Sequence, residues 1–148
     1  MFTKIIVVLF LVCSLFGFNL QSTTSLELKI QDQSIQQQVE YFSNLNGIDS
    51  NLISKIIKCE SNGNENANGD GGRAFGIMQY HKQSFENHAK LYGEELDYYS
   101  TYDQIKLGTW AIANGRGNEW TAYRAIKNGG TYSFYSKLLN KHFTAKCK

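Results

Sequence analysis

The stretch IIKCESNGNENANGDGGRAFGIMQ, from Ile56 to Gln79, decides how the rest of the chain is interpreted. It begins as the end of an apolar helix, reaches a carboxylate at Glu60, and continues as a loop rich in Gly and Asn before the short run GIMQ. Acidic residues seldom lie on a helix face that packs against a core. Glu60 is therefore either a solvated residue at a helix terminus or a functional acid.

The helix before the loop supports the second explanation. Its apolar residues form one stripe, which consists of Leu52, Ile53, Ile56 and Ile57. Glu60 follows Ile56 by four residues and so lies on the same side. Burial there and the negative end of the helix dipole both disfavour the charged carboxylate, so we expect a raised pKa for Glu60. A carboxylic acid that keeps its proton near neutral pH suits general acid catalysis on a leaving oxygen.

Helical periodicity and stop signals predict an all-α fold with six helices and at most a trace of strand. The helices are expected to begin near Ser34, Asp49 or Ser50, Lys82, Thr101, Asn118 and Thr131. The last of them is TYSFYSKLLNKHF, residues 131–143. The run AFGIMQY, residues 74–80, is interpreted as a strand fragment or a buried turn. Proline is absent, so every break depends on Gly, Asn and Asp.

Length and composition indicate one compact domain, because 148 residues of which 42% are hydrophobic can bury one core. The net charge of +2 lacks the basic stripe of a nucleic-acid binder, so no nucleic-acid partner is expected. The three histidines do not have the spacing of metal ligands; they are His81, His88 and His142. The glycines of GDGGRAFG lack the lysine of a phosphate loop. Neither a metal nor another cofactor is predicted.

The N-terminus, MFTKIIVVLFLVCSLFGF, places one lysine before an apolar run, as in a secretory signal. Residues 1–22 are predicted to be a cleaved signal, with no stable membrane association after its removal. The alternative is an uncleaved anchor, although the run falls just short of the roughly 17 to 25 residues that span a bilayer. Residues 23–37 are interpreted as a polar linker that becomes helical near its end, and residues 38–148 as the domain.

Removal of the signal would leave Cys59 and Cys147 as the remaining thiols. Two cysteines in an exported domain favour a single disulfide that ties the end of the chain to the helix of Glu60. The alternative is two unpaired buried thiols, since pairing requires Cα atoms within about 7 Å.

Short motifs follow one another along the chain: ES at residues 60–61, GIMQ at residues 76–79, and AY at residues 122–123. Their order, spacing and helical setting resemble the lytic transglycosylase family of the lysozyme-like superfamily (SLT type), over roughly residues 38–143. The resemblance implies a small lysozyme-like fold whose cleft binds peptidoglycan glycan strands. It also implies an enzyme that forms 1,6-anhydromuramic ends with Glu60 as general acid and base. Together with the predicted signal, this leads us to expect an exported enzyme that is secreted, periplasmic or associated with the cell wall.

The resemblance further implies a set of substrate-binding positions: Ser61, Gly76, Met78, Gln79, Tyr80 and Tyr123. Gln79 would hydrogen-bond sugar, and Gly76 would let the backbone approach the ligand. Tyr123 would hold the Glu60 carboxyl through its hydroxyl. The chain departs from the family pattern at Arg124, where an Asn commonly follows AY.

Two other functions fit the same residues. A hydrolytic lysozyme would use a second carboxylate, for which Asp70 is the candidate, although NGDGG favours a turn residue there. A non-catalytic glycan-binding module would use aromatic rings, which here are Tyr80, Tyr98, Tyr99, Tyr102 and Trp120. Glu60 together with Gln79 and Tyr123 favours turnover, because a module that only binds needs no desolvated acid.

Overall fold

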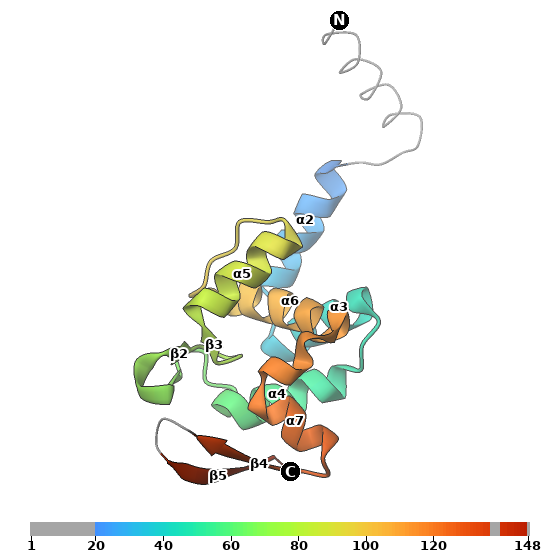
Figure 1. Ribbon diagram of the computed structural model, residues 1–148. Helices are drawn as coiled ribbons and strands as arrows, with labels where there is room; N and C mark the ends of the chain where they lie inside the picture. The colour runs from blue at the N-terminus through green and yellow to red at the C-terminus, as the bar shows by residue number, and fades with distance from the viewer. Residues whose placement is uncertain (1–19, 137–139, 148) are drawn as a thin grey trace, which may run out of the picture. The chain divides into compact units, whose positions relative to one another are not determined.

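The computed structural model describes residues 20–136 and 140–147. The chain divides into two compact units, Met1–Gln33 and Ser34–Lys148. Helix α2 (Leu20–Gln31) is the described element of the first unit (Figure 1). The second unit contains the other described elements, and it begins a few residues before the domain boundary predicted at Gln38.

The described residues cover only part of the N-terminal region. Residues 1–19 lie outside them, so the signal or anchor interpretation of residues 1–22 stays a prediction. Segment 23–37, predicted as a polar linker, is helical as far as Gln31 and again from Ile35. None of the described helices combines the length and the hydrophobicity that crossing a bilayer requires.

The second unit is mainly helical, as the sequence predicts. Its described α-helices are α3 (Ile35–Asn46), α4 (Ser50–Ser61), α5 (Lys82–Tyr92), α6 (Thr101–Ala111) and α7 (Thr121–Lys127). The local signals act as expected at α3 and α4. Ser34 and Gln37 form a capping box before α3, and Gly47 ends that helix with φ +63°. Asp49 caps α4 by accepting a hydrogen bond from the Asn51 N–H at 2.9 Å.

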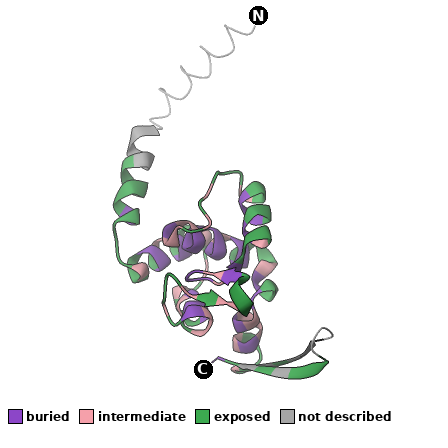
Figure 2. Cartoon of the chain, turned by 90° about the vertical axis from the view of Figure 1, so that its left-hand side faces the viewer, coloured by how far each residue is buried: buried purple, intermediate pink, exposed green. Residues whose placement is uncertain are grey.

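Helix α6 is the central helix of this unit. Most of its residues are buried, and buried residues are drawn in purple in Figure 2. Ile105 and Leu107 are fully buried. Helices α3 and α5 pack against it, while α4 packs against α3 and α7. Its one buried cation, Lys106, forms an ion pair with Glu94 at 2.6 Å. A helix covered on nearly all sides explains the strongly apolar sequence from which it was predicted.

The chain leaves α6 through irregular turns that the sequence did not indicate. A π-helical turn (Ile112–Arg116) and a 3₁₀ turn (Gly117–Glu119) lead to α7, which begins at Thr121 and not near Asn118. Trp120, between the 3₁₀ turn and α7, has an extended backbone and is buried. Its indole N–H donates to the Met78 carbonyl at 2.9 Å. This contact with a residue distant in sequence holds Trp120 in an extended conformation, so α7 begins only at Thr121.

A small antiparallel sheet follows the Gly/Asn loop. Strand β2 (Ala74–Phe75) lies between β1 (Asn68–Gly69) and β3 (Tyr80–His81). Residues 76–79, the GIMQ turn, connect β2 to β3. The run predicted as a strand fragment or a buried turn therefore contains both.

The last segment is a β-hairpin, so the helix predicted over residues 131–143 is wrong. Strands β4 (Thr131–Ser136) and β5 (Lys141–Lys146) pair antiparallel, beside α7 (Figure 1). The run TYSFYS begins by alternating polar and aromatic residues, and Thr, Tyr and Phe favour a strand once a partner lies alongside. The partner comes from the end of the chain, which local spacing does not reveal.

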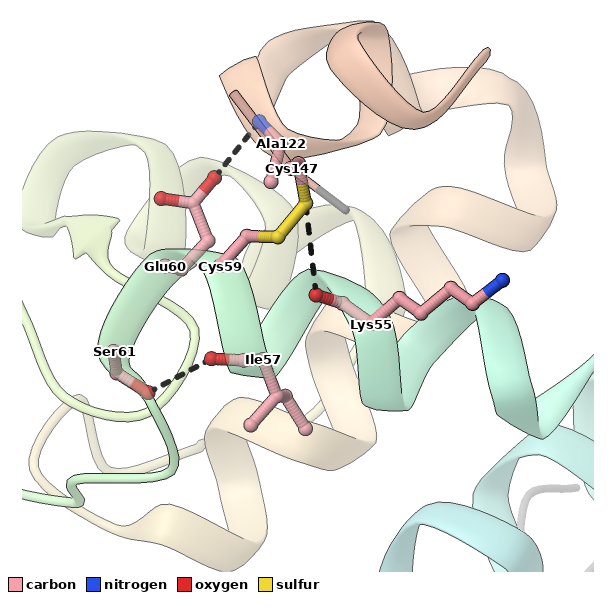
Figure 3. Close-up of a disulfide and its surroundings, with 7 residues drawn as sticks. All are labelled: Lys55, Ile57, Cys59, Glu60, Ser61, Ala122 and Cys147. Atoms are coloured by element: carbon pink, nitrogen blue, oxygen red, sulfur yellow. Dashed lines mark hydrogen bonds between the residues drawn. A yellow bond between two sulfur atoms is a disulfide. The ribbon is translucent and has the colours of Figure 1, made fainter. Parts of the chain in front are cut away.

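The disulfide expected between Cys59 and Cys147 is confirmed. It joins α4 to the residue after β5, with 5.6 Å between the Cα atoms (Figure 3). The Cys147 N–H also donates to the Gly130 carbonyl, directly before β4, at 2.8 Å. The base of the hairpin is thus attached to the helix that carries Glu60.

Replacing both Cys59 and Cys147 with Ala should lower the free energy of unfolding. The bond spans 88 residues, and the chain-entropy model assigns such a loop up to about 4.5 kcal/mol. Urea unfolding of the variant and of the wild type, with and without reducing agent, measures the loss. Reduced wild type should match the variant, and equal stability of the oxidised and reduced wild type would contradict the prediction.

Candidate active site

A pocket of about 450 Å³ lies in the second unit, and Glu60 is part of its wall. The residues that line it are Glu60, Asp70, Ala74, Gln79, Tyr80, His81, Ser84, Glu119, Trp120 and Thr121. They come from the end of α4, the loop and small sheet, the first turn of α5, and the segment that enters α7. The volume is typical of small-ligand sites, and polar side chains dominate the lining.

The Glu60 side chain points from the last turn of α4 toward α7 (Figure 3). Its Oε1 accepts a hydrogen bond from the Ala122 N–H at 3.1 Å. Burial raises the pKa of Glu60, while the Ala122 N–H and the positive charge of Arg124 lower it by smaller amounts. The net shift is upward, in the direction predicted from the apolar stripe. Glu60 can therefore hold a proton at a higher pH than an exposed glutamate.

Consecutive residues at the end of α4 point in different directions (Figure 3). Cys59 reaches Cys147, Glu60 reaches Ala122, and Ser61 turns back into the protein. The Ser61 hydroxyl lies 3.2 Å from the Ile57 carbonyl and 2.8 Å from the Ile77 carbonyl. It is buried and is not among the residues that line the pocket, so its observed role is to attach the GIMQ turn, and the substrate contact stays a prediction.

Gly76 is required by the fold at the start of the GIMQ turn. Its φ is +81°, and an added Cβ would collide with the side-chain amide of Gln104. That amide accepts a hydrogen bond from the Met78 N–H at 3.1 Å and donates one to the Tyr98 carbonyl at 2.8 Å. The group that approaches Gly76 closely in this structure is the Gln104 amide, and an approach of ligand to Gly76 stays a prediction.

Met78 is a core residue in this structure. Its side chain is fully buried, and the space beside it depends on Gly108, where an added Cβ would lie 2.6 Å from Met78 Cε. Both backbone groups of Met78 are hydrogen-bonded, to Gln104 and Trp120. The predicted contact between Met78 and substrate does not follow from this position.

Gln79 lines the pocket as expected, with its backbone at φ +51°. Its Nε2 donates to the carbonyls of Ala67 and Gly76, at 3.0 and 2.9 Å. Its Oε1 lies over Gly69, where any Cβ would collide with it. Because both amide protons are used, Oε1 is the atom that Gln79 can offer to a hydrogen-bond donor in the pocket.

The two tyrosines predicted to bind substrate, Tyr80 and Tyr123, have different surroundings. Tyr80 contributes to the pocket wall but is only 2% exposed, and its hydroxyl lies 3.3 Å from His88 Nδ1. Burial, and then the charge of Glu119, raises the pKa of Tyr80 well above its ordinary value. Tyr123 packs against Gly117, and in the described residues its hydroxyl makes no hydrogen bond with Glu60. The Ala122 backbone holds that carboxyl instead.

Asp70 lies in the same pocket as Glu60 and is also a turn residue. Its φ is +50°, and it begins a 3₁₀ turn after β1. The carboxylate makes an ion pair with Arg73 at 2.7 Å, and His81 Nε2 lies 3.1 Å from its other oxygen; both partners are exposed. The turn role is confirmed, and a catalytic role for Asp70 stays a prediction.

Sequence reasoning missed Glu119 and His88. The His88 ring is buried, and its Nε2 lies 3.1 Å from Glu119 Oε2 at the pocket wall. A signal was present, since His88 follows Phe85 by three residues on the apolar side of α5 and a buried imidazole needs partners. No group of three or more His, Cys, Asp or Glu side chains in residues 20–136 and 140–147 is arranged to hold a metal.

Comparison with known families gives one match. The family model described as Transglycosylase SLT domain covers residues 38–132, well over half of the chain. No curated protein and no solved structure gave a significant match. The matched region includes the residues that line the pocket and the AYR run at residues 122–124.

Titration of the Glu60 side chain by carbon-detected NMR should give a pKa above the ordinary value of 4.5. Arg124→Gln should raise that pKa further, because it removes a positive charge that favours the carboxylate, and Arg124→Lys should change it less. Since the folded state holds this proton more tightly, Glu60 should also make the free energy of unfolding fall as pH rises between the unfolded and folded pKa values. A wild-type value at or below 4.5 would remove the physical basis of an acid role.

Proposed function

The chain belongs to the Transglycosylase SLT domain family, and on that premise we propose that it is an exported lytic transglycosylase with Glu60 as its catalytic residue. Membership supports a transglycosylase-type enzyme that acts on the glycosidic bonds of peptidoglycan. The proposal adds the bond, between N-acetylmuramic acid and N-acetylglucosamine, and the product, a 1,6-anhydro sugar. The glycan strand of peptidoglycan is the proposed partner of the pocket.

In the proposed reaction Glu60 acts twice. First, its carboxylic acid protonates the bridging oxygen as the bond from C1 of N-acetylmuramic acid to that oxygen breaks. The carboxylate then takes the proton from the C6 hydroxyl of the same sugar, and the C6 oxygen bonds to C1. The proton given to the leaving sugar is thus recovered from the substrate, and no water is consumed. One carboxyl group is sufficient for both steps.

The desolvated Glu60 carboxyl in the pocket is the observation that carries this proposal. Ala122 engages Oε1, and the other oxygen points away from Ala122 (Figure 3). Burial raises the pKa, so the proton needed for the first step remains bound at a higher pH than on an exposed glutamate. The reaction rate should therefore fall as pH rises through the raised pKa of Glu60.

A hydrolytic lysozyme is the second candidate, because Asp70 lines the same pocket as Glu60. A second carboxylate would either activate a water molecule that attacks C1 or attack C1 itself to form a covalent intermediate. Asp70 is already paired with Arg73 and His81, which support the loop geometry. These contacts favour the structural role, and the products distinguish the two reactions.

Export is part of the proposal and is supported by the apolar N-terminal run and by the Cys59–Cys147 disulfide, since disulfides persist in oxidising compartments. Expression of the full chain with its own N-terminus should yield a shortened protein outside the cytoplasm. The intact mass of that protein gives the cleavage position. Recovery of the full-length chain from the membrane alone would instead support the anchor.

Digestion of purified cell walls, followed by mass spectrometry, tests the chemistry. Wild type should release 1,6-anhydro muropeptides, and Glu60→Gln should lower the rate by about 100-fold or more, because it removes the general acid. Asp70→Asn should retain activity within a few-fold.

Three other outcomes are informative. Reducing-end products that also depend on Asp70 would select the lysozyme. Binding of cell walls without any release would select the glycan-binding module. Full activity of Glu60→Gln would contradict both enzymatic mechanisms.

A further inference from the structure

Glu119 is a carboxylate at the pocket that the proposed reaction does not use. Its Oε2 and Oε1 lie 3.1 and 3.3 Å from His88 Nε2, and Arg116 Nη1 lies 3.6 Å from Oε1. The His88 side chain is 3% exposed, whereas that of Glu119 is 43% exposed. Glu119 is therefore held from inside the protein, while its partly exposed side chain lines the pocket.

The partners of His88 define its hydrogen bonds. An ionised Glu119 only accepts hydrogen bonds, so His88 Nε2 must carry a proton. On the other side of the ring, Nδ1 faces the buried hydroxyl of Tyr80 at 3.3 Å. Tyr80 on β3 and His88 on α5 thus form a buried hydrogen-bonded chain that ends at Glu119.

The carboxylate of Glu119 is held more rigidly than that of Asp70. The two side chains that contact the Asp70 carboxylate, Arg73 and His81, are 65% and 49% exposed, and contacts between exposed polar groups are weak. The buried partner of Glu119 cannot move away without breaking its contact with Tyr80. Of these two acids, Glu119 has the orientation that a specific hydrogen bond to a ligand requires.

We propose that Glu119 is a second substrate-facing carboxylate, which accepts hydrogen bonds from hydroxyl or acetamido N–H groups of an N-acetylated sugar in the pocket. His88 and Tyr80 are positioning residues that hold it. Neighbouring Trp120 and Thr121 lie in the same wall and extend the surface that the sugar contacts. This inference rests on the proposed function for its ligand class but does not require that Glu60 cleave the sugar.

Binding without turnover tests the role of Glu119. Chitopentaose, a soluble N-acetylglucosamine pentamer, is titrated into Glu60→Gln protein by calorimetry. Adding Glu119→Gln should weaken binding by about 10-fold, the size expected for a hydrogen bond to a charged group. Glu86→Gln, an exposed carboxylate on α5 that faces Lys82 at 4.0 Å, is the matched control and should leave the Kd unchanged.

The positioning role of His88 and Tyr80 is tested separately, by NMR and by a further binding measurement. Nitrogen-15 spectra should show His88 protonated at Nε2, and chitopentaose should shift the His88 ring signals. That shift should disappear in Glu119→Ala, and Tyr80→Phe should weaken binding by a smaller factor than Glu119→Gln. A purely structural Glu119 would give no ligand-dependent shift at His88.

The possible failures are distinguishable. An unchanged Kd in Glu119→Gln, or no binding of chitopentaose by the folded Glu60→Gln protein, would overturn the inference. Loss of binding in Glu119→Gln combined with no cell-wall cleavage by wild type would support the inference and reject the proposed reaction. Thermal unfolding of every variant confirms that each measurement is made on folded protein.

Discussion

The backbone of the GIMQ turn is buried, and its polar groups must be hydrogen-bonded away from water. Side chains from three other segments meet this requirement. Gln104 of α6 accepts from the Met78 N–H, Ser61 of α4 donates to the Ile77 carbonyl, and Trp120 donates to the Met78 carbonyl. The turn therefore joins α4, α6 and the entry to α7. Because Glu60 precedes Ser61 and Ala122 follows Trp120 by two residues, the same contacts bring Glu60 and Ala122 together.

The burial that holds this arrangement together also gives Glu60 its chemistry. Packing of α4 against α7 removes the carboxyl from water and raises its pKa, while the Ala122 N–H and the Arg124 charge limit the rise. The disulfide at Cys59 attaches the same turn of α4 to the end of the chain. Glu60 thus lies between Cys59, which is fixed by the disulfide, and Ala122, which is fixed by the packing of α7. Its environment depends on residues far from it in sequence.

Local signals predicted the local structure well. Capping residues placed the starts of α3 and α4, a glycine placed the end of α3, and the apolar stripe placed Glu60 on the packed side of α4. The predictions failed where a distant partner decides the outcome. Residues 131–136 form a strand because residues 141–146 pair with them, and α7 starts late because the Trp120 indole reaches Met78. Helical spacing within one segment contains no information about such partners.

The sequence by itself determined the family, the helix that carries the acid, the upward direction of the Glu60 pKa shift and the two cysteines that pair. These follow from short motifs and from periodicity, which act over a few residues. Only the tertiary structure showed that Ser61, Gly76 and Met78 support the turn, and that Glu119 is held at the pocket by a buried histidine. The contact from Ala122 to Glu60 joins residues 62 positions apart. Hydrogen bonds over such separations depend on which segments pack together, and the periodicity of one segment does not identify the segment it packs against.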